Sequence, residues 1–90
     1  MSKTNLKRVA LEHAIEDRGL KAVFLDGFDN CIIGSTDLPD GGVSICYDTE
    51  KILKSLQKQG MYRSEAVEYF DFNVAGCKFS EGNPTFIDTL

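Results

Sequence analysis

The sequence lacks long apolar runs and has little proline. No hydrophobic stretch approaches the roughly 20 residues that cross a bilayer, and the first residues, MSKTNLKR, lack the apolar core of a signal peptide. Only two of the 90 residues are proline and 42% are hydrophobic, so the signature of a disordered chain is absent. We therefore expect one folded domain spanning residues 1–90, in the cytoplasm and without membrane contact.

Metal-binding and redox residues are also scarce. The chain has three cysteines and one histidine, with no CxxC pair: Cys31, Cys46, Cys77 and His13. These spacings do not supply the close ligands of a zinc site, and an odd cysteine count does not suit a disulfide framework. We expect free, buried cysteines, no metal and no cofactor. A catalytic Cys–His pair could use only His13, which has no supporting motif, so we do not expect an enzyme.

Positive charge is missing from the middle of the chain. Residues 22–50 contain no lysine or arginine but carry six acidic residues: Asp26, Asp29, Asp37, Asp40, Asp48 and Glu50. The net charge of the whole chain is −4. Because phosphate contacts require a basic patch, we do not expect nucleic acid as the main partner. The acidic segment is compatible with a protein partner that has a basic surface.

An amphipathic helix is predicted over residues 4–18. Thr4 suits the N-cap position, and Gly19 suits the position after the C-cap. Five residues follow the spacing of one helical face: Leu6, Val9, Ala10, His13 and Ala14. We therefore expect this face to be buried, with His13 at the margin of the core.

Short β-prone runs follow this helix. KAVFL and CIIGS, separated by the turn-rich DGFDN, predict a hairpin of strands 21–25 and 31–36. VSICY alternates apolar and polar residues and predicts a half-buried strand over residues 43–47. After a Gly-Asn-Pro turn, TFI predicts a short last strand over residues 85–87.

A second helix is predicted over residues 49–59, beginning at Asp48 or Thr49 and ending at Gly60. Its apolar residues share an inward face and its lysines point outward: Ile52, Leu53 and Leu56 against Lys51, Lys54 and Lys58. With a third helix over residues 64–76, the order is α-β-β-β-α-α-β. This order predicts an α+β domain with a mainly antiparallel sheet and helices packed on one face.

The third helix, SEAVEYFDFNVAG, begins at Ser64 as its cap and ends at Gly76. At about 100° per residue, six residues share one arc: Tyr69, Asn73, Ala66, Phe70, Val74 and Val67. We therefore expect Asn73 to be buried and to bind backbone groups of the Cys77–Pro84 loop or the acidic hairpin, with a ligand or partner chain as the alternative. Phe72 falls outside the arc, either as an edge-of-core aromatic or as an exposed anchor. Its neighbours on that face are acidic: Glu65, Glu68 and Asp71.

The aspartates of LDGFDN and DLPDGG occupy predicted turns. Asp26 and Asp29 are three residues apart, which does not fit a phosphotransfer motif, and their surroundings do not match a calcium loop. We interpret them as turn residues that bind nearby backbone amides, with a divalent-cation site shared with Asp37 or Asp40 as the alternative. DLPDGG lacks the lysine of a phosphate-binding loop and is interpreted as a hairpin turn.

Three stretches, GFDNCIIG, EAVEYFDFNVAG and GNPTFI, together resemble a pattern found in small uncharacterised proteins of tailed bacteriophages. The resemblance covers roughly residues 20–88 and contains no catalytic signature. It implies a setting, the infected bacterial cytoplasm, in which small acidic proteins bind and inhibit host factors. It implies no functional residues.

The leading hypothesis is a non-enzymatic, phage-type binding protein that inhibits or modulates a host defence or regulatory protein. Its predicted contact residues form an acidic stripe with one aromatic, joined by an acidic turn: Glu65, Glu68, Asp71, Phe72, Asp26 and Asp29. The alternative is an oligomeric protein that binds a nucleotide-like ligand through Asn73 and the glycine turns. A metal-dependent enzyme using the aspartate turns is the third hypothesis. The small core of a chain this short makes a homodimer plausible.

Overall fold

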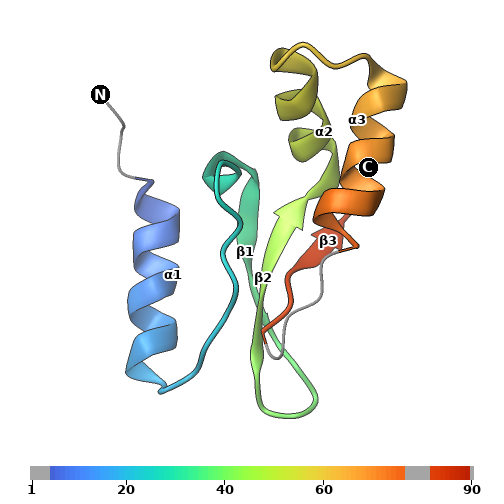
Figure 1. Ribbon diagram of the computed structural model, residues 1–90. Coiled ribbons are helices and arrows are strands. Elements are labelled where there is room, and N and C mark those ends of the chain that lie inside the picture. The colour runs from blue at the N-terminus through green and yellow to red at the C-terminus, as the bar shows by residue number, and fades with distance from the viewer. Residues whose placement is uncertain (1–4, 77–81, 90) are drawn as a thin grey trace.

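The computed structural model describes residues 5–76 and 82–89 of the chain. Its elements follow in the order α1 (Leu6–Asp17), a 3-10 turn (Asp29–Cys31), β1 (Ile32–Asp37), β2 (Val43–Asp48), α2 (Thr49–Lys58), α3 (Arg63–Tyr69), a π-helical turn (Phe70–Val74) and β3 (Thr85–Ile87). The predicted α+β class is confirmed. Figure 1 shows α1 beside β1, with α2 and α3 next to each other on the other side of the molecule.

The three strands form one mixed sheet in the order β1-β2-β3. β1 and β2 are an antiparallel hairpin, and β2 pairs with β3 in parallel. The antiparallel pair is the longer one and contains a β-bulge between Ile32 and Gly34. The hairpin closes at the predicted DLPDGG turn, where the Leu38 N–H donates to the Gly42 carbonyl at 2.8 Å.

The predicted hairpin between residues 21–25 and 31–36 is wrong, because residues 21–25 are extended but belong to no strand. Their backbone groups make separate contacts. The Val23 N–H donates to the Gly82 carbonyl at 3.0 Å, and the Leu25 N–H donates to the buried hydroxyl of Tyr47 at 2.8 Å. The 3-10 turn then leads straight into β1, whose partner is β2. The β propensity of residues 21–25 indicated an extended backbone, but it could not indicate which segment would pair with it.

β2 is completely buried, which corrects the prediction of a half-buried strand. The alternation of polar residues is real, but β2 is the central strand and both of its faces are covered. Ser44 is satisfied in the interior, where its hydroxyl lies 2.6 Å from the Asn83 carbonyl and 2.7 Å from the Thr85 hydroxyl. The last residue, Asp48, accepts from the backbone N–H groups of Glu50 and Lys51 and caps α2.

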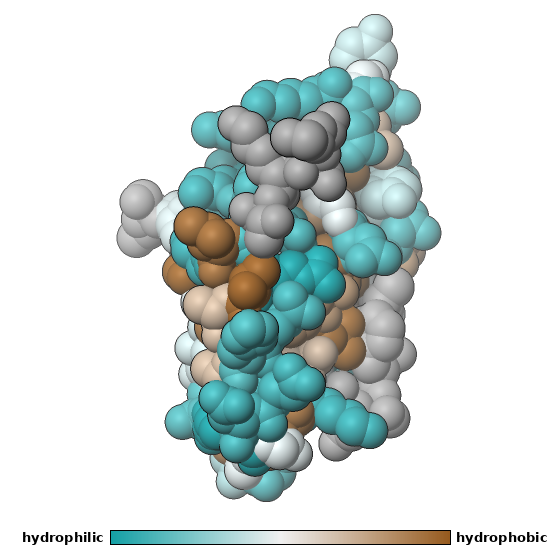
Figure 2. Space-filling view, turned by 90° about the vertical axis from the view of Figure 1, so that its left-hand side faces the viewer, coloured by the Kyte–Doolittle hydropathy of each residue, from teal (hydrophilic) through white to brown (hydrophobic). Residues whose placement is uncertain are grey.

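α1 presents a different face to the core from the predicted one. Ile15 is buried and Leu11 packs beside it, whereas Leu6 is 79% exposed and His13 is also exposed. Figure 2, which looks at the α1 side, shows small apolar groups among hydrophilic side chains. The N-cap is Asn5, whose side chain accepts from the Arg8 N–H; the predicted cap, Thr4, lies outside the described residues.

Polar contacts explain the orientation of α1. The Arg8 guanidinium pairs with Asp29 at 2.9 Å and lies 4.9 Å from the centre of the Phe24 ring. The Lys7 ammonium donates to the Ile32 carbonyl at the β1 edge at 3.0 Å. The methylene groups of these two long side chains pack against the protein surface, while their charged ends bind the partners just named. Of the predicted inward residues, Leu6, Ala10, His13 and Ala14 are therefore exposed and only Val9 is half-buried.

α2 agrees with the prediction at both ends and on both faces. Asp48 caps it, and its apolar residues are buried while its lysines are exposed: Ile52, Leu53 and Leu56 against Lys51, Lys54 and Lys58. At its C-terminus, the N–H groups of Gly60 and Met61 return to the carbonyls of Gln57 and Leu56. Gly60 has a φ of +108°, a conformation that glycine adopts without steric cost.

The buried cysteines behave as expected where they can be followed. Cys31 and Cys46 are buried and free. Burial raises the pKa of both thiols. Cys77, the third cysteine, lies outside the described residues.

Candidate functional site: the acidic–aromatic face of α3

α3 begins one residue before the predicted start. Its N-cap is Tyr62, and the Tyr62 N–H donates to the carboxylate of Glu65 at 2.9 Å. The prediction of Ser64 as the cap is therefore wrong. Glu65 therefore stabilises the start of α3 as well as being exposed on the surface, because its negative charge lies at the positive end of the helix dipole.

The second half of the predicted third helix is a π-helical turn over Phe70–Val74. The Ala75 N–H donates to the Phe70 carbonyl at 2.7 Å, which is the i→i+5 bond of a widened turn. A residue in such a turn advances by less than the 100° or so of an α-helix. Val74 consequently stays below Phe70 and Ala66, and all three are buried. Turns of this kind occur frequently at functional sites.

The π turn moves Asn73 out of the apolar arc. Asn73 is exposed, so the prediction that it is buried is wrong. Tyr69 and Val67, which the regular helical period also placed in the arc, are 42% and 39% exposed. The predicted contact of Asn73 with the Cys77–Pro84 loop falls largely on residues 77–81, which lie outside the described residues.

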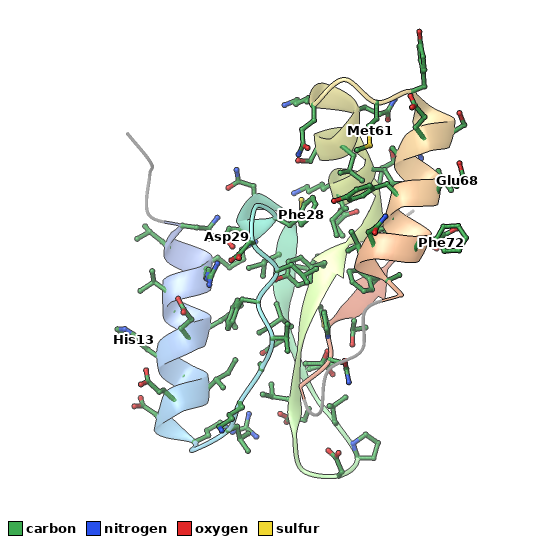
Figure 3. All side chains as sticks on the ribbon, in the orientation of Figure 1. His13, Phe28, Asp29, Met61, Glu68 and Phe72 are labelled. Atoms are coloured by element: carbon green, nitrogen blue, oxygen red, sulfur yellow. The ribbon has the colours of Figure 1, made fainter. Side chains whose placement is uncertain are left out.

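Phe70 and Phe72 illustrate the two sides of this helix. Phe70 is buried and meets Phe86 of β3 edge to face, with ring centres 5.0 Å apart and planes at 86°. Phe72 is 76% exposed, so of its two predicted roles the structure shows the exposed one. Figure 3 shows Glu68 and Phe72 pointing away from the sheet on the outer side of the helix.

We call the exposed set Glu65, Glu68, Tyr69, Asp71 and Phe72 the acidic–aromatic face. A shallow groove of about 320 Å³ runs along this face. It is lined by four residues of the face and by two neighbours, Met61 and Asn73; the four are Glu65, Glu68, Tyr69 and Phe72. Neither Glu68 nor Asp71 forms an ion pair with any basic group of the described residues. Negative charge and aromatic surface are thus left unneutralised and uncovered by the part of the chain that the structure describes.

The acidic turn does not join this face. Asp29 pairs with Arg8 of α1, and Figure 3 shows it between α1 and β1, away from Glu68 and Phe72. Its hydrogen bond to Arg8 raises the pKa of that guanidinium. Asp26 is exposed in the same turn. Of the six predicted contact residues, the structure brings the four from residues 65–72 together on one helical segment, whereas Asp26 and Asp29 belong to the segment before β1.

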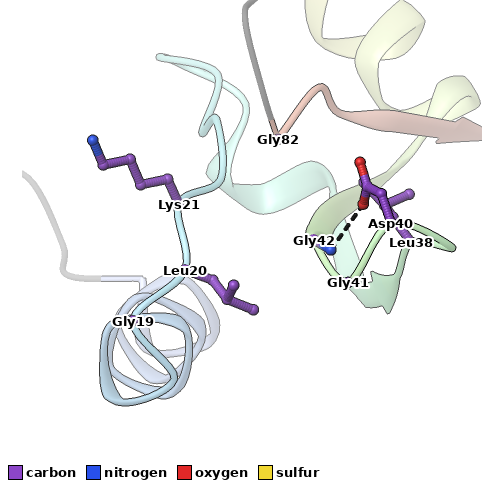
Figure 4. Close-up of a pocket in the computed structure, with 8 residues that line it drawn as sticks. All are labelled: Gly19, Leu20, Lys21, Leu38, Asp40, Gly41, Gly42 and Gly82. Atoms are coloured by element: carbon purple, nitrogen blue, oxygen red, sulfur yellow. Dashed lines mark hydrogen bonds between the residues drawn. The ribbon is translucent and has the colours of Figure 1, made fainter.

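The glycine turns form a separate pocket. Figure 4 shows this pocket of about 300 Å³, between the end of α1, the β1–β2 turn and Gly82. Within it, Asp40 accepts from the Gly42 N–H at 2.8 Å, which is the predicted turn-stabilising role of an aspartate. Asn73 lines the α3 groove instead, so the structure does not bring Asn73 and the glycine turns into one ligand site.

Sequence reasoning missed Tyr62 and Tyr69 as surface residues. Tyr62 is 78% exposed at the start of α3, next to the groove residue Met61. It lies in MYR, a short connection without periodicity, so no pattern assigned its environment. Tyr69 was assigned to the core because it falls within the predicted arc, but it lies at the edge of that arc and is 42% exposed.

Comparisons of the chain with family models, with curated proteins and with solved structures found no match. In the described ranges 5–76 and 82–89, no group of three or more His, Cys, Asp or Glu side chains could hold a metal ion. No helix in those same ranges has the length and apolar character needed to cross a membrane.

Proposed function

We propose that this chain is a non-enzymatic binding protein that contacts a second protein through the acidic–aromatic face. The observation that carries the proposal is Phe72, which is 76% exposed beside Tyr69, Glu68 and Asp71. Aromatic side chains ringed by polar groups are frequent anchors of protein interfaces. The groove of about 320 Å³ beside it offers a place for a partner side chain.

The two components of the face would act at different stages of binding. The unpaired carboxylates of Glu68 and Asp71 would attract a basic surface during the diffusional encounter. The Phe72 ring would then supply buried apolar area in the complex. Binding should therefore weaken as salt is raised, because added ions screen exposed charges.

The proposed partner is a protein with a basic surface. The resemblance to small phage proteins supports a host defence or regulatory protein in the bacterial cytoplasm as this partner, which binding would inhibit or modulate. The described part of the chain gives little support for catalysis. His13 points away from the sheet, and the thiols of Cys31 and Cys46 are buried with a raised pKa, which disfavours the reactive thiolate.

The proposal is tested by affinity capture from bacterial lysate with Phe72→Ala and Glu68→Lys variants. Each has a matched control on another surface: Ile33→Ala for the exposed apolar residue of β1, and Glu16→Lys for the exposed acid of α1. We expect both α3 variants to lose the captured protein and both controls to keep it. Equal recovery with all four variants would exclude this face.

A further inference from the structure

Three lysines of α2 converge on a pocket that the acidic–aromatic face does not include. Lys51, Lys54 and Lys58 line one side of a cavity of about 390 Å³. The remaining lining residues are small or neutral and come from α2 and the segment before β1: Ser55, Gly27, Asn30 and Cys31. We call this the lysine pocket. Its volume lies in the range of about 300 to 1,000 Å³ that is typical of small-molecule sites.

The lysine pocket keeps most of its positive charge within the described part of the chain, where Glu50 attracts Lys54 without forming an ion pair with it. None of the three ammonium groups forms an ion pair there. Glu50, the acid at the start of the same helix, is engaged by Arg63 through both carboxylate oxygens, each at 2.7 Å. Like charges spaced three or four residues apart on a helix repel each other. A bound anion would relieve this repulsion.

Neutral hydrogen-bond donors complete the set. Ser55 is partly buried and carries a hydroxyl. The side-chain oxygen of Asn30 accepts a hydrogen bond from the side-chain amide of Asn5 at 3.0 Å. The side-chain NH₂ group of Asn30 therefore remains as a donor. Charged and neutral donors around one compact space are the chemistry that recognises phosphate oxygens.

We propose that the lysine pocket binds the phosphate group of a small phosphorylated molecule. A compact ligand suits the structure better than a nucleic acid, because polymer binding needs an extended basic path and the chain carries a net charge of −4. The site is independent of the proposed protein interface: it lies on α2 rather than on the outer side of α3, and its charge has the opposite sign.

The test is a titration of the full chain with inorganic pyrophosphate and with adenosine diphosphate, followed by two-dimensional amide NMR. We expect saturable shifts of the Gly27, Asn30 and Ser55 amides with both probes, and none with adenosine. Saturable binding of adenosine as tight as that of the diphosphate would overturn the proposal. So would a short single-stranded oligonucleotide that binds more tightly than the diphosphate, and so would the absence of saturation with both phosphate probes.

Variants separate the pocket from general charge effects. Lys54→Gln and Lys58→Gln should each weaken pyrophosphate binding by about tenfold. Lys54→Arg should retain most of the affinity, because it keeps the charge. Lys21→Gln removes the same charge from an exposed site outside the pocket and should leave affinity within about twofold. Equal losses in Lys21→Gln and Lys54→Gln would contradict a specific site, and unchanged melting temperatures would show that all variants are folded.

Discussion

α2 and α3 pack against each other, yet only the inward face of α2 could be predicted correctly from the sequence. In α2 the α-helical period continues from the Asp48 cap to Gly60, so every predicted inward residue is buried. In α3 two residues at the edges of the predicted arc, Val67 and Tyr69, are exposed although they precede the π turn, and Asn73 is exposed within that turn. The comparison teaches that the predicted apolar arc of α3 was too wide, and that the π turn accounts only for the exposure of Asn73.

The two helices also differ in the charge of their outer sides. α2 presents lysines and α3 presents carboxylates, and the bidentate Arg63–Glu50 pair joins the start of one to the start of the other. In this pair, Arg63 is a basic residue of the otherwise acidic α3, and Glu50 is an acidic residue of the lysine-rich α2. The remaining charges on each helix are therefore free to meet ligands of opposite sign.

The largest effect is expected from changing the length of α3. Deleting Glu68 moves Phe70 and Val74 out of their buried positions relative to Ala66, and we expect the loss of about 5 kcal/mol or more to unfold a domain of this size. Deleting Asp71 removes the extra residue of the π turn and leaves Phe70 and Val74 on the buried side. We expect that variant to remain folded. Circular dichroism melting curves compare the two, and equal destabilisation would contradict the assignment of the π turn.

The next effect distinguishes the two phenylalanines. Phe70→Ala should lower the free energy of unfolding by about 3 to 5 kcal/mol, because it removes a buried ring and its contact with Phe86. Phe72→Ala should change it by no more than about 0.5 kcal/mol, because the side chain is exposed. Urea unfolding measures both values. A large loss with Phe72→Ala would show that Phe72 supports the fold.

The glycines that follow the two helices provide a smaller contrast. Gly60→Ala should cost about 1 to 2 kcal/mol, because alanine is strained at a positive φ although no atom blocks its Cβ. Gly76→Ala should cost about 1 to 3 kcal/mol for a different reason. A Cβ at residue 76 would lie 2.9 Å from the carbonyl oxygens of Asp71 and Phe72. D-alanine, introduced by chemical synthesis at residue 60, should restore stability there, and failure to do so would contradict the conformational explanation.

The smallest effect concerns the pair that joins the helices. The hydrogen bond from Arg63 lowers the pKa of Glu50 below its ordinary value of 4.5. The stability that the pair contributes is therefore present above that value and is lost as pH falls through the lower pKa of the folded state. Arg63→Gln should melt slightly below the wild type at neutral pH, and this difference should shrink as the pH falls through the lowered pKa of Glu50. A difference that persists in acid would indicate a role for Arg63 beyond this pair.

Side-chain periodicity predicted α2, the strands of the β1–β2 hairpin, β3 and the C-terminal turn of α1, because each depends on local signals. It failed for the inward face of α1, where an arginine and two large aliphatic residues take the place of a more regular apolar stripe. It also failed for residues 21–25. The Val23 N–H donates to the Gly82 carbonyl and the Leu25 N–H to the Tyr47 hydroxyl, and both partners are distant in sequence.

The candidate site was predicted only in part, because local signals again succeeded and contacts between distant segments were missed. Glu65, Glu68, Asp71 and Phe72 are close in sequence, so their common face followed from any helical conformation. The assignment of Asp29 to that face failed, because its partner Arg8 lies in a different element. The lysine pocket was not foreseen, since its far wall comes from the segment before β1 and only the folded chain brings it to α2.

The Lys7 ammonium on the Ile32 carbonyl also bears on how the protein behaves in concentrated solution. β1 is an edge strand, and an unpaired edge is a template on which another molecule can add a strand. Lys7 occupies one of the acceptors that such an intruder would need, and it brings a charge that opposes stacking of chains. The opposite edge, β3, is only three residues long. Both edges of the sheet therefore disfavour the addition of a strand from another molecule: the β1 edge because of the Lys7 ammonium, and the β3 edge because the strand is short.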